Sequence, residues 1–95
     1  MLRVVAKHVV LPELAEPERV SQWLREVALT EGVEGWVAPS AGGIEAWFEG
    51  SISAVDAMVA WCESQGAEAG ASIQCSSQRP CLKGGFELLK QAPSA

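Results

Sequence analysis

Apolar positions recur along this chain with two different periods, which separate predicted strands from predicted helices. The stretch from Leu2 through Val10 is rich in β-branched residues and is followed by Pro12, which predicts a strand that ends before the proline. Pro17 then suits the first turn of a helix, and Gly32 suits its end. Between them runs an apolar stripe at i, i+3, i+4, i+7 and i+8, predicted to face the sheet: Val20, Trp23, Leu24, Val27 and Ala28.

The second half of the chain predicts a hairpin, another helix and two further strands. Residues 36–37 and 44–48 flank a segment with Pro39 and paired glycines, which favours a reversal between antiparallel strands. Ser53 and Asp56 have the spacing of a capping box, so a helix is predicted from there to Gly66. Its predicted sheet-facing residues are Val55, Met58, Val59 and Cys62. Residues 71–76 predict a strand, 77–85 a loop and 86–89 a short terminal strand.

This order of elements predicts an α+β fold of the ferredoxin-like βαββαβ type. We expect a four-stranded antiparallel sheet with two helices on one face, and a short C-terminal strand added to it. At 95 residues, the stretch 1–95 is predicted to form a single domain.

Composition narrows the functional classes. With 48% hydrophobic and 20% charged residues the chain is expected to be globular, and no apolar run is long enough to span a bilayer. Arg3, Lys7 and His8 interrupt the first apolar run, which does not resemble a secretion signal, so a cytoplasmic location is expected. The net charge of −5 and the scattered basic residues oppose binding to nucleic acid or to an anionic membrane.

The chain has three cysteines and one histidine, with no metal-ligand spacing. Neither a disulfide framework nor a metal site is predicted, and no cofactor is expected. Cys62 is expected to be a buried apolar residue, whereas Cys75 and Cys81 are expected to be reduced thiols in a strand or loop. His8 is expected to be a hydrogen-bonded strand residue. Glu45 and Glu49 lie four apart, hence on one face of a strand, and are expected to be solvated.

The segment from Ala28 through Val37 resembles part of the acylphosphatase family. In that family an Ala near the end of the first helix precedes Leu-Gly-Leu, one further residue, and then Gly-Trp-Val at the start of the second strand. Here Ala28, Gly32, Val33 and residues 35–37 hold those places. The resemblance extends over nearly the whole chain, to Arg3-Val4, Gly43-Ile44-Glu45, Gly50, Val55, Trp61, Gly66 and Phe86-Glu87-Leu88.

Acylphosphatases hydrolyse acyl phosphates to a carboxylate and phosphate. The resemblance implies a glycine-rich loop whose N–H groups surround the phosphate, an Arg at the end of that loop, and an Asn shortly after Gly-Trp-Val that orients water. The Arg position, fourteen residues before Gly35, is Ser21. The Asn position falls at Pro39, or at Ser40 if the hairpin is one residue shorter. The loop segment 13–20 has no glycine.

The same segment carries Glu13, Glu16 and Glu18, which would repel a phosphate, although acidic residues also suit a helix start. The resemblance therefore implies a degenerate member, catalytically inactive and acting as a binding or interaction module. Its partner would be an unidentified protein or small molecule, and an edge strand of the sheet allows a homodimer.

Two other functions stay open. One is acyl phosphate hydrolysis through a rebuilt site, in which Arg19 and Ser40 replace the missing pair. Arg19 is expected instead to lie on the surface or to pair with Glu16, because two residues along a helix turn it about 200° away from position 21. The other is a small-molecule regulatory domain, which requires a ligand crevice at a sheet edge or a dimer interface.

Overall fold

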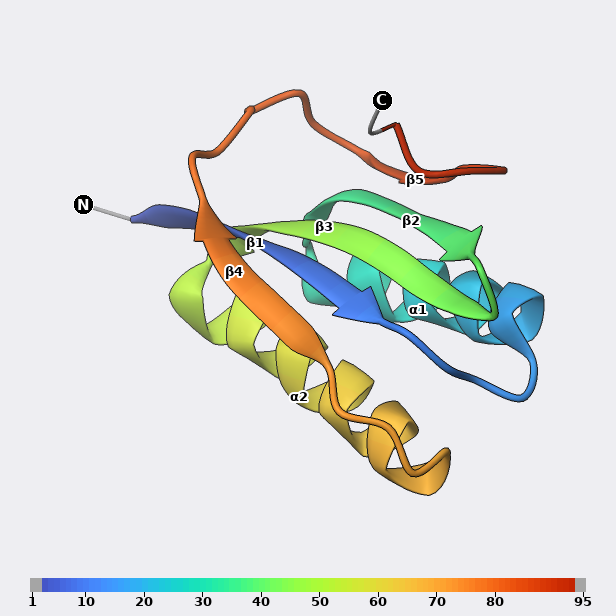
Figure 1. Cartoon of the computed structure of the whole chain (residues 1–95). Coiled ribbons are helices and arrows are strands. Elements are labelled where there is room, and N and C mark those ends of the chain that lie inside the picture. Colours follow the sequence, from blue (N-terminus) through green and yellow to red (C-terminus); the bar gives the residue numbers. More distant parts are fainter. Residues whose placement is uncertain (1–2, 94–95) are drawn as a thin grey trace.

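A computed structural model describes residues 3–93 and has the predicted α+β architecture. The strands are β1 (Val4–Leu11), β2 (Glu34–Ser40), β3 (Gly43–Ser51), β4 (Gln74–Gln78) and β5 (Phe86–Leu88), and the helices are α1 (Pro17–Glu31) and α2 (Ile52–Glu68). The strand order is β4-β1-β3-β2-β5, and both helices lie on one side of the sheet (Figure 1). Within the described residues, no helix is both long and apolar enough to cross a membrane.

The four-stranded antiparallel core of the prediction is confirmed, and the short C-terminal strand makes the sheet mixed. Strand β3 pairs antiparallel with β1 and β2, and β1 pairs antiparallel with β4. The fifth strand, β5, pairs with β2 in the parallel direction. After β4 the chain runs along the sheet face that the helices leave open (Figure 1).

The main core lies between the sheet and the helices. Alternate β3 residues, Ile44, Ala46 and Phe48, are fully buried on the helix side. Helix α2 contributes Val55, Met58 and Cys62, as predicted. Other members of this core are Val9, Leu11, Val20, Leu24, Ala28, Val33, Val37 and Phe86. The helix-facing prediction is wrong for Trp23, which is 49% exposed at the edge of the α1 stripe, while Ser21 takes a buried place.

Helix α1 begins and ends where the local signals predict. Pro17 is its first residue, and Gly32 ends it in the left-handed conformation with a φ of 73°. The N–H of Val33 then donates to the carbonyl of Ala28 at 2.9 Å. Leu2, where the first predicted strand begins, lies outside the described residues.

Three predicted boundaries are displaced. Helix α2 is capped by Ser51, whose Oγ accepts from the N–H of Ala54 at 3.2 Å, so the predicted cap at Ser53 is wrong. The helix continues past Gly66 to Glu68. Strand β4 starts three residues later than predicted, because Ala71 still donates to the Gly66 carbonyl as part of the helix end.

The β2–β3 hairpin is tighter than the sequence predicts. Its strands extend to Ser40 and from Gly43, leaving only Ala41 and Gly42 as the turn, both with positive φ. Gly43 lies so close to β1 that a Cβ there would stand 1.8 Å from the Leu11 carbonyl oxygen. The hairpin turn is therefore held against the end of β1.

Candidate functional site

The segments that the family resemblance implicates do meet in space, at the end of β1. The N–H of Leu14, in the loop after β1, donates to the carbonyl of Gly42 in the β2–β3 turn at 2.9 Å. Pro39 and Ser40 form the last part of β2, opposite Ile44 and Gly43. The loop after β1 and the β2–β3 turn are therefore in direct contact.

Ser21, at the family's Arg position, is the fifth residue of helix α1. Its exposed fraction is 0%, and its Oγ has no hydrogen-bond partner among the described residues. The Ser21 side chain therefore points into the protein and lines neither of the two cavities described below. Burying a hydroxyl without a hydrogen-bond partner costs free energy, so the Ser21 hydroxyl does not stabilise the folded protein.

Three positions in segment 13–20 offer no free backbone N–H group to a phosphate. Leu14 donates to Gly42, Val20 donates to the Glu16 carbonyl at 3.0 Å, and Pro17 has no N–H. Residues from 17 on are already helical, so the loop itself is limited to residues 12–16. Glu13, Glu16 and Glu18 are exposed around it.

Arg19 has partners other than a ligand. Its Nη1 lies 3.3 Å from Glu16 Oε2, which confirms the predicted pair, and its guanidinium stands 5.0 Å above the centre of the Trp23 ring. The Arg19 side chain is 61% exposed. A hollow of about 320 Å³ lies beside these residues, between the loop and the end of α2.

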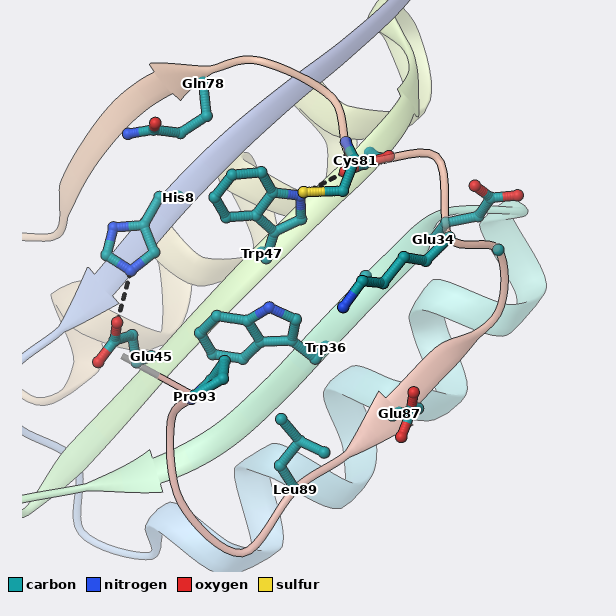
Figure 2. Close-up of a pocket in the computed structure, with 14 residues that line it drawn as sticks. His8, Glu34, Trp36, Glu45, Trp47, Gln78, Cys81, Glu87, Leu89 and Pro93 are labelled. Carbon is teal, nitrogen blue, oxygen red and sulfur yellow. Dashed lines mark hydrogen bonds and ion pairs between the residues drawn. The ribbon is translucent and has the colours of Figure 1, made fainter. Parts of the chain in front are cut away.

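A second and larger cavity lies on the opposite face of the sheet. It encloses about 610 Å³ between the open sheet face and the chain after β4. Figure 2 shows the indoles of Trp36 and Trp47 side by side on its floor, with His8 and Glu45 at one end. The sequence does not predict this cavity, because its roof, residues 81–85, comes after β4 in the chain.

His8 and Glu45 form a pair in this cavity. His8 Nε2 lies 2.6 Å from Glu45 Oε2, and both side chains are largely buried, with 27% and 16% exposed. The prediction that His8 is a hydrogen-bonded strand residue is confirmed. The His8 ring is tilted against both indoles, with centroid distances of 6.3 Å to Trp36 and 6.4 Å to Trp47.

The prediction that Glu45 and Glu49 are solvated is wrong for both, since Glu45 is largely buried beside His8. Glu49 has a role of its own. It is 3% exposed, and its carboxylate accepts from Trp47 Nε1 at 2.6 Å, from the Cys81 N–H at 2.6 Å and from the Leu82 N–H at 2.9 Å. Burial by itself raises the pKa of this carboxyl, but the donors from Cys81, Leu82 and Trp47 stabilise the charged form and leave the pKa below its ordinary value. Glu49 therefore anchors the roof of the cavity to its floor.

The cysteines lie as predicted. Cys62 is buried, whereas Cys75 and Cys81 are exposed free thiols. Burial, with smaller contributions from Cys75 and Glu63, raises the pKa of the Cys62 thiol to about 12. Among residues 3–93, no group of three His, Cys, Asp or Glu side chains is arranged to hold a metal ion.

Comparison with known proteins identifies the family. No protein-family model matches the chain. Over 54 residues the chain is 46% identical to an acylphosphatase of Synechococcus sp., a match that spans 56% of this chain and 55% of that relative. Over 66 residues it is 43% identical to an acylphosphatase of Haloquadratum walsbyi, spanning 67% of this chain and 71% of the relative. The chain belongs to the acylphosphatase family.

The acylphosphatase fold is also evident in three dimensions. A solved acylphosphatase structure from Coxiella burnetii matches with a TM-score of 0.77, over 90% of this chain and 93% of that chain. The sequence identity between the two is 16%, so this likeness concerns the fold. The chain is an acylphosphatase-like domain with a ferredoxin-like sheet.

Proposed function

We propose that this acylphosphatase-like domain does not hydrolyse acyl phosphates and serves instead as a binding module. The observation that carries the proposal is the burial of Ser21 at the family's Arg position. Hydrolysis of an acyl phosphate needs fixed donors and positive charge where negative charge develops. An enclosed hydroxyl supplies neither a charge nor an accessible donor.

The electrostatics of the loop support the same conclusion. Glu13, Glu16 and Glu18 are all exposed on the segment where the resemblance implies the phosphate, and each like-charge contact at surface dielectric is unfavourable by about 1 kcal/mol or more. Neither the Leu14 N–H, which is bonded to Gly42, nor Pro17 can donate to an anion there.

The second candidate is hydrolysis through a rebuilt site that uses Arg19 and Ser40. Its support is that the relatives are named acylphosphatases. Against it, Arg19 is paired with Glu16 and lies over Trp23, so moving it to a phosphate would break both contacts. We therefore favour the inactive domain.

An acyl phosphate hydrolysis assay with acetyl phosphate separates the two candidates. We expect no turnover above the spontaneous rate from the wild-type protein. Turnover that Arg19→Ala abolishes, and that the control Arg25→Ala on the same helix leaves intact, would overturn the proposal. An NMR titration with inorganic phosphate at low salt provides a second measurement, in which the amide signals of residues 13–21 are expected not to move.

Restoring the Arg alone is expected to fail. Ser21→Arg places a guanidinium at a fully buried helix position, where it must either disrupt packing or turn toward the glutamates of the loop. Catalytic groups of such a site act as a unit, so their effects are strongly non-additive. A glycine-rich loop over residues 13–20, together with Ser21→Arg and an Asn at position 39 or 40, is expected to recover some hydrolysis.

A further inference from the structure

The cavity on the open sheet face has the size and the pre-formed shape of a small-molecule site. Its volume of about 610 Å³ falls within the range of ligand pockets, about 300–1,000 Å³. The roof is fixed at two places. Glu49 holds the N–H groups of Cys81 and Leu82, and further along the chain Gly35 donates to the Gly85 carbonyl at 2.9 Å.

The floor of the cavity is aromatic. Trp36 and Trp47 are direct cross-strand partners on β2 and β3, so their indoles stand next to each other on the open face. Both side chains are only partly buried, although the roof passes above them. Figure 2 shows both rings in broad view at the centre of the cavity. The face of an indole ring carries negative electrostatic potential and attracts cations.

The charged groups of the cavity favour the same kind of ligand. Four carboxylates line it, from Glu34, Glu45, Glu49 and Glu87, against the cationic Lys83 and the single His8. Two of these carboxylates already have partners: Glu49 accepts three hydrogen bonds, and Glu45 is paired with His8. Glu34 and Glu87 have no ion-pair or hydrogen-bond partner within the part of the chain described, and they leave an excess of negative charge.

We propose that this cavity binds a small organic cation with an alkylated ammonium group, held on the faces of Trp36 and Trp47 and balanced by Glu34 and Glu87. An alkylated ammonium is weakly hydrated, so it loses little on leaving water, and its methyl groups can pack on the indoles. A phosphate-bearing ligand would instead meet a surplus of carboxylates. The site is on the sheet face away from Ser21, so it stands whether or not that side hydrolyses acyl phosphates.

The test is a titration of the protein with choline, followed by NMR of the indole N–H signals. The chain has four tryptophans, of which Trp36 and Trp47 line the cavity while Trp23 and Trp61 do not. We expect saturable shifts of the first two, with a Kd of about 1 mM or tighter, while the other two stay in place. Equal movement of all four signals, or no saturable movement, would overturn the proposal.

Two comparisons separate a cation site from a merely apolar one. The neutral isostere of choline, 3,3-dimethylbutan-1-ol, is expected to bind at least about tenfold more weakly, because it has the same shape without the charge. Equal binding of the two compounds would contradict the proposal. Inorganic phosphate is expected to leave the signals of Trp36 and Trp47 unchanged.

Substitutions localise the site. Trp36→Leu is expected to weaken choline binding by about tenfold, whereas the control Trp23→Leu, on the exposed face of α1, leaves it unchanged. Because Trp36→Leu removes a large side chain from the sheet, the exposed residue Glu87 provides a second variant that does not threaten folding. Glu87→Gln is expected to weaken choline binding by about threefold at low salt. The control Glu63→Gln, on α2, is expected to leave the affinity for choline unchanged. Unchanged affinity in both cavity variants would refute the assignment.

Discussion

Replacing Glu49 by Gln is expected to release the segment that follows β4 from the sheet. The Glu49 carboxylate accepts three N–H groups: Oε1 accepts from Trp47 Nε1 and the Cys81 N–H, and Oε2 accepts from the Leu82 N–H. Glutamine keeps the shape but turns one of the two oxygens into an NH₂ donor. At least one of the three N–H groups then faces another donor. The remaining hydrogen bonds are weaker, because their acceptor is no longer charged.

The size of the effect follows from these contacts. A buried N–H left without an acceptor costs about 1–3 kcal/mol, and hydrogen bonds to a charged acceptor are worth about 1 kcal/mol more than neutral ones. Cys81 and Leu82 are exposed residues, so water replaces part of what is lost once the segment lifts. We expect the free energy of this local opening to fall by about 2–3 kcal/mol, which makes opening about 30- to 150-fold more frequent.

Native-state amide hydrogen exchange measures this opening directly. The amides of Cys81 and Leu82 are expected to exchange faster in Glu49→Gln by that factor, while the amides of β1 and β3 keep most of their protection. Glu34→Gln, on the same sheet face but with no hydrogen bond to the segment, is the control. If Cys81 and Leu82 exchanged within about threefold of the wild-type rate, the anchoring role of Glu49 would be refuted.

The same contacts predict a pH dependence of the opening. Because the pKa of Glu49 is lower in the folded protein than its ordinary value of 4.5, the stabilisation by Glu49 is fully present above that value and is lost as the pH falls through the folded pKa. Below pH 4.5, the protection factors of the Cys81 and Leu82 amides, which correct for the slower intrinsic exchange in acid, are therefore expected to fall. In Glu49→Gln this acid response is expected to be absent.

Two further predictions concern buried groups. Iodoacetamide at about pH 8 is expected to modify Cys75 and Cys81 and to spare Cys62, because burial raises the pKa of the Cys62 thiol to about 12. Mass spectrometry after cleavage at glutamate checks this, because Cys62 then lies in peptide 50–63 and the other two cysteines lie in peptide 69–87. Rapid labelling of Cys62 in the folded protein would contradict the prediction. Ser21→Ala is expected to leave the free energy of unfolding unchanged or to raise it by up to about 1 kcal/mol, because it removes a buried hydroxyl that has no partner. Urea denaturation measures this change. A loss of more than about 1.5 kcal/mol would mean that the hydroxyl has a hydrogen-bond partner.

Much of the fold could be predicted because its signals are local. Pro17, the apolar stripe of α1 and Gly32 lie within one helix length, and the structure keeps both ends. Strand β4 is different, since all five of its residues are exposed and polar or small, and no alternation indicates which face is buried. Its place is set by pairing with β1, a long-range contact that a window of sequence does not contain.

The role of Glu49 illustrates the same limit at the site. From the sequence, Glu45 and Glu49 differ only by position, and both suit a solvated strand face. In the structure Glu49 is buried because two of its donors come from Cys81 and Leu82, more than thirty residues later in the chain. Ser21 could be placed at the family's Arg position from spacing alone, but its burial depends on how α1 packs, which spacing does not give.

Successive side chains of β3 point to opposite faces of the sheet, so the core side and the cavity side have different residues. Ile44, Ala46 and Phe48 point to the helices and to the side where Ser21 lies, whereas Glu45, Trp47 and Glu49 point to the cavity. A polar substitution on the cavity face therefore removes no side chain from the main core. The acidic loop and the aromatic cavity are therefore separate sites, and the two tests are independent. Failure of the choline titration would not change the conclusion from the acetyl phosphate assay, and hydrolysis of acetyl phosphate would not contradict choline binding.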